Sequence, residues 1–378
     1  MNSIAIVRGK FLNQYEMQSY APLAKTYDIT AFGSLYPYHD TFDFPVVKLA
    51  SPMDIPEIPF KMQILNRLCI DAQYLYGLES KLRGFDIAHT AETYYHYTQQ
   101  CLDAKKKGYI KKVVATVLEN IPHNNEGIWG RKSFKERSRS ELDHIIALTK
   151  ITKDTLLLEG ADPNKITVIG HGIDTKRFKP SVDHMKYLGR SKGTVRILFS
   201  GRMETYKGVF VILEALRILT LDKTLHIPFE MRFVGIGSQE KAMKRKIQEY
   251  RLEDRVQCAS VSYDLMPKEY EKADIALAPS IGTKTWTEQY CTALLEAQSM
   301  GLPIVTTRSG GIPENVGACA LFAEENDEQT LAKQLKRFIE DPSLRVYFGR
   351  NARERAIKVH DTHIIAGKIS RVYQSLLS

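Results

Sequence analysis

Two glutamates, Glu288 and Glu296, stand eight residues apart in the run Glu-Gln-Tyr-Cys-Thr-Ala-Leu-Leu-Glu. Glu296 lies in a segment whose apolar residues recur at helical spacing, and Gly301-Leu302-Pro303 ends that segment. If the residues between the acids are helical, eight steps give a rise of roughly 12 Å, about the reach of a nucleoside diphosphate joined to a sugar. A helix N-terminus between the acids would suit the diphosphate. The alternative is a surface helix that carries two glutamates.

A second candidate for phosphate chemistry follows the strand-like run 195–199. The segment Gly201-Arg202-Met203-Glu204-Thr205-Tyr206-Lys207-Gly208 places an arginine and a lysine five residues apart between glycines. A guanidinium binds phosphate oxygens as a fork, and an ammonium binds them as a point charge. Glycine lets the backbone approach a ligand closely. The alternative is an ordinary basic loop between a strand and a helix.

The composition is that of a globular chain long enough for two domains. The chain has 378 residues, 43% of them hydrophobic and 26% charged, and a net charge of +9. No apolar run is long enough to span a bilayer, and the N-terminal apolar run 4–7 is too short for a signal peptide. The five cysteines are scattered and form no Cys-x-x-Cys pair. We therefore expect a cytoplasmic protein with reduced thiols, no disulfide and no metal site.

Short β-branched runs alternate with helix-sized segments in both halves of the chain, which predicts an α/β protein with parallel sheets covered on both faces. Proline and glycine in a polar, basic stretch predict a linker at 181–194. The expected architecture is two doubly wound domains, 1–180 and 195–360, followed by a helix over 361–378 that packs toward the first domain. A long amphipathic helix is predicted over 60–82, and ligands are expected at the carboxyl ends of the strands.

Four segments together resemble the retaining glycosyltransferases of family 4, also called glycosyl transferases group 1. The family has two Rossmann-like domains that face a central cleft, the GT-B fold. The match is dense over 165–320 and thin in the first half. The segments run from His171 to Pro180, from Gly201 to Gly208, from Glu288 to Ala297 with Gly301-Leu302-Pro303, and from Gly310 to Glu314.

The resemblance implies a donor site in the second domain and an acceptor site in the first. Arg202 and Lys207, with Gly201 beside them, would neutralise the leaving diphosphate without a metal or other cofactor. Glu288 would contact the donor sugar, and Glu296 would hold the ribose hydroxyls of a UDP- or GDP-sugar. The backbone after Glu288, which is Gln289, Tyr290, Cys291 and Thr292, would bind phosphate. The chain departs from the family at Cys291, where glycine is usual, and at His171, where asparagine is usual.

On the acceptor side, the family often has a histidine and an aspartate after the strand that corresponds to 113–117. Alignment on Pro122 places Leu118 and Glu119 at those positions. We expect Glu119 to be the polar group nearest the transferred sugar, ahead of His123, whose alternative is an ordinary loop histidine. Glu16 in the first loop is a further candidate.

The expected partners are a nucleotide sugar and a glycan or lipid-linked acceptor. The basic runs 105–112 and 131–139, with aromatic residues nearby in the sequence, suggest contact with an anionic membrane surface, and the alternative is a solvated basic face. No nucleic-acid-binding module is recognised, so nucleic acid is not expected. Two other functions stay open: a nucleotide-sugar epimerase or other enzyme of the same fold, and an inactive nucleotide-sugar-binding protein.

Overall fold

The computed structural model describes the backbone of residues 1–378 and the side chains of all except 185–187. By their contacts the residues form two compact units, Met1–Gly172 with Thr362–Ser378, and Ile173–Asp361. The segment 181–194, predicted as a linker, lies in the second unit and contains α7 (Val182–Tyr187). The side chains of 185–187 within it lie outside the described residues. The predicted α/β class with parallel sheets is confirmed.

The first unit is built on a seven-stranded parallel sheet in the order β3-β2-β1-β4-β5-β6-β7. Its core strands are strongly apolar because helices cover both faces of the sheet. The strands are β1 (Ser3–Gly9), β2 (Asp28–Gly33), β3 (Val46–Lys48), β4 (Ile87–Ala91), β5 (Lys112–Val117), β6 (His144–Ala147) and β7 (Ile166–Val168).

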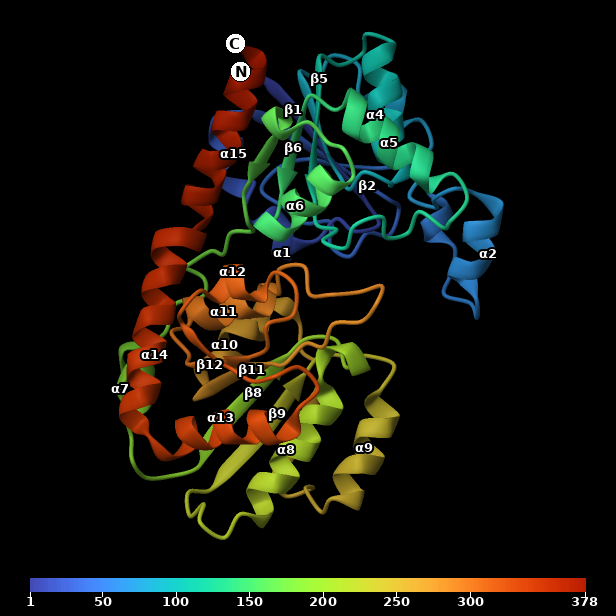
Figure 1. The fold of residues 1–378 in the computed structure, drawn as a ribbon. Coiled ribbons are helices and arrows are strands. Elements are labelled where there is room, and N and C mark those ends of the chain that lie inside the picture. The colour runs from blue at the N-terminus through green and yellow to red at the C-terminus, as the bar shows by residue number, and fades with distance from the viewer. The chain divides into compact units, whose positions relative to one another are not determined.

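Two apolar clusters fill the faces of this sheet. One packs under α4 (His96–Lys106), and the other under α15 (Thr362–Leu377), which lies along the first unit in Figure 1. Tyr27 and Tyr373 meet edge to face in the second cluster. The remaining helices of the unit are α1 (Gln14–Met17), α2 (Lys61–Leu68), α3 (Leu78–Lys81), α5 (Arg131–Glu141) and α6 (Lys150–Leu158), with 3-10 turns at Ala21–Lys25, Pro52–Asp54 and Pro163–Lys165.

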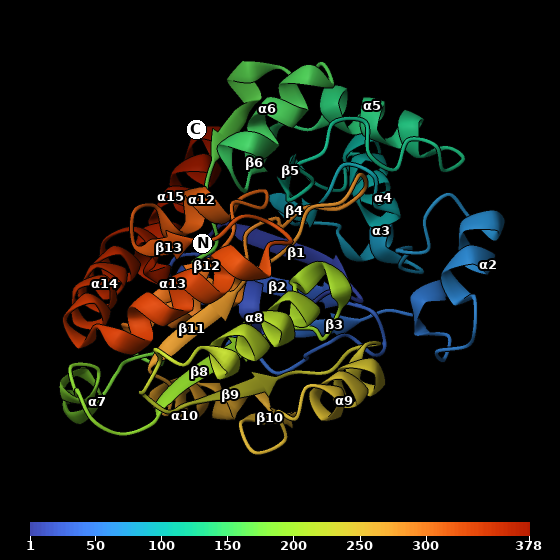
Figure 2. The ribbon, with the colours of Figure 1, turned by 60° about the horizontal axis from the view of Figure 1, so that its bottom comes forward.

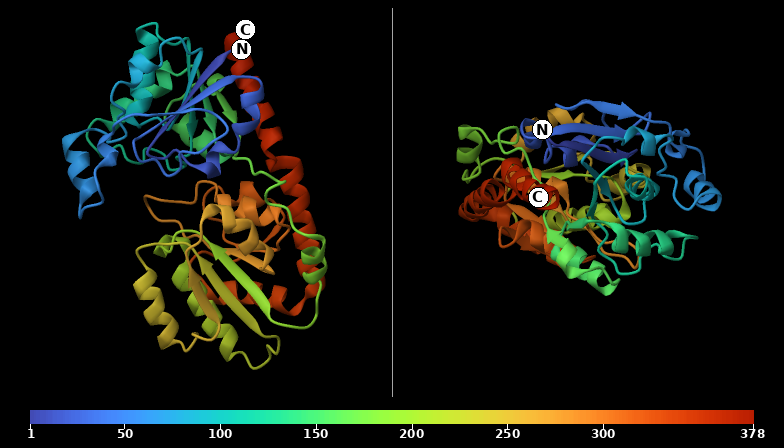
Figure 3. Two further views of the ribbon diagram at one scale, coloured as in Figure 1. Left: turned by 180° about the vertical axis from the view of Figure 1, so that it is seen from behind. Right: turned by 90° about the horizontal axis from the view of Figure 1, so that it is seen from above.

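The prediction of one long helix over 60–82 is wrong. The structure has α2 and α3 there, separated by an irregular stretch over 69–77. Asp71 explains the break, because its carboxylate accepts hydrogen bonds from the backbone N–H groups of Gln73 and His96, and it pairs with Arg131. These contacts tie the stretch to α4 and α5 and replace the bonds of a continuous helix. α2 extends away from the rest of the first unit (Figure 3).

The second unit is built on a six-stranded parallel sheet in the order β10-β9-β8-β11-β12-β13. Its apolar core lies largely beneath α8 (Val209–Leu221) and α13 (Glu328–Glu340), which cross one face of the sheet side by side (Figure 2). The strands are β8 (Val195–Ser200), β9 (Phe229–Val234), β10 (Val256–Ala259), β11 (Ile275–Ala278), β12 (Ile304–Thr306) and β13 (Ala320–Phe322). The other helices are α9 (Glu240–Glu249), α10 (Met266–Glu271), α11 (Thr292–Ser299), α12 (Ile312–Val316) and α14 (Pro342–Arg355), with 3-10 turns at Thr205–Lys207 and Tyr263–Leu265 and a π-helix at Ala356–His360.

Both sheets reverse their strand order beside the first strand of the unit. In the first unit the reversal falls between β1 and β4, and in the second between β8 and β11. In open parallel sheets, ligands bind outside the carboxyl ends of the strands at this reversal. The loops that follow these four strands are therefore where binding side chains are expected.

Candidate active site

Glu288 and Lys207 meet at the strand reversal of the second unit. The Nζ atom of Lys207 lies 2.5 Å from Oε2 of Glu288, and the hydroxyl of Ser280 donates to the same oxygen at 2.8 Å. Lys207 follows β8, Ser280 follows β11, and Glu288 lies before α11. Glu288 is buried, so an ionised carboxylate there requires these partners. The cluster places one cation and one acid at the edge of the sheet where ligands of open parallel sheets bind.

Gly208 determines how closely the loop that carries Lys207 approaches the loop after β11. Its φ is +77°, and a Cβ atom there would lie 2.1 Å from the backbone oxygen of Pro279. The backbone N–H of Ile281 donates to the oxygen of Tyr206 at 2.8 Å. Any side chain at position 208 would separate the two loops, so this glycine is required for the contact between Lys207 and Glu288.

The backbone of Glu288 is held by the segment that follows β12. The N–H of Gly311 donates to the Glu288 oxygen at 2.8 Å, and the Glu288 N–H reaches the hydroxyl of Ser309 at 3.5 Å. The glycine pair Gly310-Gly311 noted in the sequence therefore lies against Glu288.

Glu296 is buried in α11 beside Tyr270, whose hydroxyl donates to its Oε2 atom at 2.8 Å. Burial raises the pKa of Glu296 to about 7, against the hydrogen bond from Tyr270, which lowers it. The side chain thus changes between neutral and ionised forms near neutral pH. An ionised carboxylate here would accept two hydroxyl hydrogen bonds, as binding of a ribose requires.

Cys291 is the residue before α11 and adopts the left-handed backbone conformation, with φ +55° and ψ +79°. Asn315 holds this conformation, because its side-chain nitrogen donates to the backbone oxygens of Tyr290 and Cys291. Left-handed backbone favours glycine, the residue usual in the family, so Cys291 keeps the geometry without the glycine. Burial raises the pKa of its thiol to about 12, so it is not a thiolate nucleophile at neutral pH.

The helix expected between Glu288 and Glu296 begins at Thr292, so only the second half of the segment is helical. Glu288, Gln289 and Tyr290 lie before the helix. The rise of a continuous helix therefore does not apply to the separation of the two carboxylates. The left-handed turn at Cys291 is the physical reason, because it ends the regular geometry on the N-terminal side of α11.

Arg202 lies in the loop after β8 that begins at Gly201, and its exposed guanidinium lies 5.4 Å from the ring centre of Tyr206. Tyr206 packs against Trp286 at 4.3 Å between ring centres, and the ammonium of Lys207 lies 5.0 Å from the Trp286 ring. Sequence reasoning assigned no role to Tyr206, Trp286, Tyr270 or Ser280. The only indication in the sequence that these residues belong to the site was their position near the predicted motifs.

The predicted acceptor-side residues lie in the loop after β5 of the first unit. Glu119 is buried, and its Oε1 atom accepts the backbone N–H groups of Asn120 and Ile121 at 3.0 Å each. Its Oε2 atom accepts from the side chain of Asn124 at 2.8 Å. Much of its hydrogen-bonding capacity therefore stabilises its own loop. Whether Glu119 also contacts a substrate stays a prediction.

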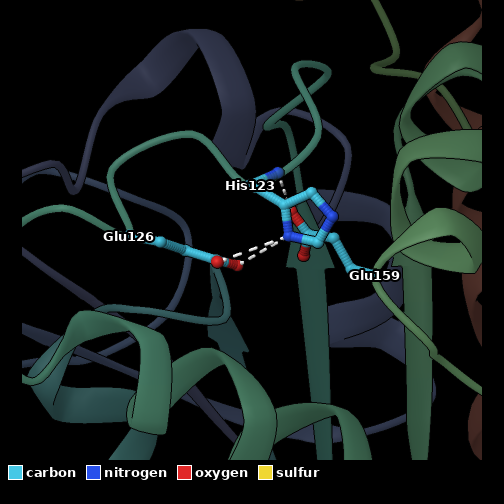
Figure 4. A group of neighbouring side chains, drawn as sticks. All are labelled: His123, Glu126 and Glu159. Atoms are coloured by element: carbon cyan, nitrogen blue, oxygen red, sulfur yellow. Dashed lines mark hydrogen bonds and ion pairs between the residues drawn. The ribbon is translucent and has the colours of Figure 1, made fainter.

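His123 lies four residues further along and is 59% exposed, with its Nδ1 atom 3.3 Å from Glu126 (Figure 4). Its backbone N–H donates to Glu159 at 2.8 Å. His123, Glu126 and Glu159 have the chemistry of metal ligands, but Glu159 already pairs with Lys135 at 2.5 Å and Arg139 at 3.1 Å. These cations satisfy the charge of Glu159, so the group does not point to a metal site.

His171 and Glu16 belong to the first unit and lie near Arg8. Burial lowers the pKa of His171, while Glu16 raises it and Arg8 lowers it. The Nε atom of Arg8 lies 3.8 Å from Oε2 of Glu16. The role of His171 in donor binding stays a prediction, because the cluster of Lys207 and Glu288 belongs to the other unit.

The two basic runs of the first unit are largely compensated by acids. In 105–112, Lys105 and Lys112 pair with Asp143, Lys107 with Glu79, and Lys111 with Asp86. The run 131–139 is compensated in the same way. There Arg131 pairs with Asp71, Arg137 with Asp103 and Glu141, and Lys135 and Arg139 with Glu159. The runs are thus weaker attractors of an anionic membrane than their sequence indicates.

Two family descriptions match adjoining parts of the chain. Residues 43–177 match "Glycosyltransferase Family 4", and residues 181–355 match "Glycosyl transferases group 1". The chain belongs to the family 4 glycosyltransferases. The resemblance in its motifs is therefore confirmed. Family 4 enzymes are metal-independent glycosyltransferases, and the motifs predicted to form the donor site fall in the second of the two matches.

Curated relatives of this family 4 member include proteins named for polysaccharide biosynthesis. WcaL of Salmonella typhimurium, a putative colanic acid biosynthesis glycosyltransferase, is 30% identical over 280 residues, which are 72% of this chain and 66% of that protein. The MMP alpha-(1->4)-mannosyltransferase of Mycolicibacterium hassiacum is 25% identical over 80% of this chain and 73% of that protein. The match thus spans just under two thirds of the first relative's length.

Solved structures share the fold of the whole chain. HepE of Anabaena, in complex with UDP and glucose, aligns over 99% of this chain and 100% of its own with a TM-score of 0.77 and 16% identity. Sucrose-phosphate synthase from Thermosynechococcus elongatus aligns over 100% and 99% with a TM-score of 0.77 and 17% identity. At these identities the likeness establishes the GT-B fold.

Proposed function

We propose that this chain transfers a sugar from a nucleoside diphosphate sugar to a hydroxyl group of a glycan or lipid-linked acceptor, with retention at the anomeric carbon. The observation that carries the proposal is the meeting of Lys207, Ser280 and Glu288 at the strand reversal of the second unit. Glu296 lies on α11 in the same unit and supplies a second acid for the nucleoside end of the donor.

The chemistry breaks the bond between the anomeric carbon and the diphosphate, and the diphosphate leaves with the electron pair. The acceptor oxygen forms the new bond, and its proton passes to the departing phosphate. Lys207 and Arg202 stabilise the charge that develops on the leaving group. Glu288 orients the donor sugar and keeps Lys207 in place before the donor arrives.

The donor we propose to test first is a UDP-sugar. Structures of HepE were solved with UDP, with UDP and glucose, and with UDP-glucose, and their fold is that of this chain. A GDP-sugar is the alternative. For the acceptor, the relatives named for colanic acid and amylovoran biosynthesis favour a growing polysaccharide.

Membrane contact remains part of the proposal, but an apolar surface supports it better than the basic runs do. None of the described helices has the length and apolarity to cross a membrane. The segment 55–68, which includes α2, exposes apolar side chains that suit shallow insertion between lipid headgroups. They are Ile55, Ile58, Phe60, Met62, Ile64 and Leu68. Flotation with liposomes of neutral and of anionic lipid tests this, and no flotation with either would contradict it.

The test of the main proposal is incubation with a panel of radiolabelled UDP- and GDP-sugars, with and without oligosaccharide acceptors. Transfer or slow hydrolysis of one donor supports the proposal. Release of an epimerised nucleotide sugar would identify an epimerase, and tight binding without turnover would identify an inactive binding protein. Lys207→Ala serves as the control, and turnover equal to that of the unaltered protein would overturn the scheme.

A further inference from the structure

The loop predicted to bind the donor diphosphate, residues 289–292, is held by one buried side chain. Asn315 on α12 is fully buried, and its side-chain nitrogen donates to the backbone oxygens of Tyr290 and Cys291. Its side-chain oxygen accepts from the amide of Gln298 on α11 at 2.7 Å. Because Gln298 binds the oxygen, the nitrogen of Asn315 faces the loop.

This contact fixes the direction of two backbone N–H groups. In a planar trans peptide unit the carbonyl and the N–H point in opposite directions, and none of the described peptide bonds is cis. Asn315 holds the carbonyls of Tyr290 and Cys291 on its own side. The N–H groups of the same two peptide units, those of Cys291 and Thr292, therefore point away from Asn315. No acceptor for either N–H is found among the described residues.

The two N–H groups stand where an anion is favoured. They lie at the N-terminus of α11, where backbone N–H groups and the helix dipole attract negative charge. The left-handed backbone of Cys291 is costly for a residue other than glycine, so it needs contacts that hold it, and Asn315 supplies them. A phosphate on the side away from Asn315 would receive two donors that are already oriented, which lowers the cost of binding.

Asn315 is itself held by two side chains from the end of α14 and the π-helix. Nε2 of His360 lies 3.0 Å from the backbone oxygen of Asn315, which can only accept, so Nε2 carries the proton of the neutral ring. Nδ1 of the same ring then accepts from the hydroxyl of Tyr290 at 3.4 Å. Nε of Arg355 donates to the Asn315 oxygen at 2.8 Å. His360 is 1% exposed, so its ring joins Asn315 to the loop inside the protein.

The backbone of His360 lies where the chain leaves the second unit. The chain connects the two units only at the crossovers 172–173 and 361–362. The N–H of Ile173 donates to the His360 oxygen at 2.7 Å, and Ile173 also forms a parallel bridge with Asp361. His360 ends the π-helix, a type of turn that is frequent at functional sites. One residue thus contacts the donor loop through its ring and a crossover through its backbone.

We propose that Asn315 is a positioning residue for the diphosphate of the donor, and that His360 ties its position to the crossovers between the units. The inference rests on the proposed function and specifies how its phosphate-binding amides are held. A diphosphate that accepts from these amides fixes the loop, and so restricts the motion of Asn315 and His360. Donor binding should therefore slow hydrogen exchange in 356–362, a segment with none of the residues predicted to contact the donor.

The first test measures how Asn315→Leu binds UDP and uridine, by ligand-observed NMR titration. Leucine has about the size of asparagine but cannot donate a hydrogen bond. The affinity for UDP should fall roughly tenfold or more, the loss of at least one charge-assisted hydrogen bond. The affinity for uridine should stay within about twofold, because uridine lacks the diphosphate that the amides bind. GDP and guanosine replace these probes if the unaltered protein binds only GDP.

Ser299→Ala is the matched control on the same helix. The hydroxyl of Ser299 is buried and donates to the backbone oxygen of Phe178 at 2.6 Å, at the opposite end of α11 from the loop. Its removal should lower the unfolding temperature, because a buried hydrogen bond is lost, and leave the Kd of both ligands unchanged. If this control lost as much UDP affinity as Asn315→Leu, the effect would belong to the packing of α11, and the inference would be overturned.

Hydrogen exchange of the full chain with and without UDP tests the role of His360. In the unaltered protein, UDP should slow exchange in 356–362. His360→Leu should lose this slowing even when saturated with UDP, because leucine cannot donate to the Asn315 oxygen. His360→Gln should restore it, since the glutamine amide can donate there. If Asn315→Leu fails to fold, the ratio of UDP to uridine affinity in His360→Leu takes its place, with a loss for UDP expected.

The outcomes that would overturn each part are distinct. Unchanged UDP affinity in Asn315→Leu, or equal losses for UDP and uridine, would remove Asn315 as a positioning residue. Exchange in 356–362 that UDP does not slow in the unaltered protein, or slows equally in His360→Leu, would remove the tie to the crossovers. In both cases UDP binding by the unaltered protein leaves the proposed function standing. An unaltered protein that binds neither UDP nor GDP would count against the proposed function itself.

Discussion

The ammonium of Lys207 lies 2.5 Å from the carboxylate of Glu288, although 81 residues separate them in the chain. The contact joins the loop after β8 to the segment before α11, which are neighbours because β8 pairs with β11. In the proposed mechanism, the acid satisfies this cation until a donor binds and its diphosphate takes the acid's place beside Lys207. We therefore expect the pair to stabilise the folded protein and to hold Lys207 ready for a donor.

Lys207→Ala should lower the free energy of unfolding by about 3 kcal/mol, because it removes the cation that neutralises the buried carboxylate of Glu288. Urea unfolding measures this. The control is Lys336→Ala, which breaks a pair with Asp222 at the surface and should cost much less, because water screens that pair. Equal losses for the two variants would show that the contact of Lys207 with Glu288 contributes no more than a surface pair.

Arg202→Ala should weaken UDP binding with no measurable loss of stability. The guanidinium is exposed and forms none of the ion pairs found among the described residues. Its removal therefore leaves no buried charge without a partner. A lost charge-assisted bond of about 1.5–3 kcal/mol corresponds to roughly a 10- to 150-fold rise in Kd. Isothermal titration calorimetry with UDP measures it, and Arg217→Ala, which breaks an exposed pair on α8, should bind UDP normally. Unchanged UDP affinity in Arg202→Ala would remove this residue from the donor site.

UDP binding should strengthen as the pH rises through about 7, where Glu296 ionises. Below that pH the neutral carboxyl has lost acceptor capacity for the ribose hydroxyls. The diphosphate itself titrates near pH 6, so the informative quantity is the difference between the unaltered protein and Glu296→Gln over pH 5–9. Parallel affinity profiles for the two proteins would contradict ribose binding by Glu296.

The raised pKa of Glu296 also predicts how the stability of the protein depends on pH. The folded pKa of Glu296 lies above the ordinary value of 4.5, so the folded state binds the proton more tightly. Its contribution is full below pH 4.5 and is lost as the pH rises to about 7. Glu296→Gln should lack this loss, so denaturant midpoints of the two proteins should diverge between pH 4.5 and 7 and differ by a constant amount above pH 7.

Cys291→Gly should stabilise the protein by about 1 kcal/mol and preserve donor turnover, because φ is +55° at this position and glycine adopts such a conformation without strain. Thermal unfolding measures the change. Cys258→Gly is the control, since Cys258 lies in β10, where glycine should destabilise. A destabilised Cys291→Gly protein would mean that the packing of the thiol outweighs the backbone strain.

Much of this protein follows from local patterns in its sequence. The alternation of apolar runs with helix-sized segments predicts the two parallel sheets, because a strand buried on both faces must be apolar along its length. The donor-site motifs were recognisable because each combines a charged residue with glycine or with a helical stretch, and these occur in the order of the family. Arg202, Lys207, Glu288 and Glu296 were all named on that basis.

Tertiary structure decided which of these groups meet and in what state. That Lys207 reaches Glu288 depends on strand pairing and on the close approach at Gly208, and neither is encoded in a local pattern. The raised pKa of Glu296 comes from burial, which a sequence does not specify residue by residue. The basic runs of the first unit suggest an anion-binding surface in the sequence, but in the folded protein acids from other segments pair with most of their charges. Local periodicity determines secondary structure, whereas charge and hydrogen bonding depend on distant segments that only the folded chain brings together.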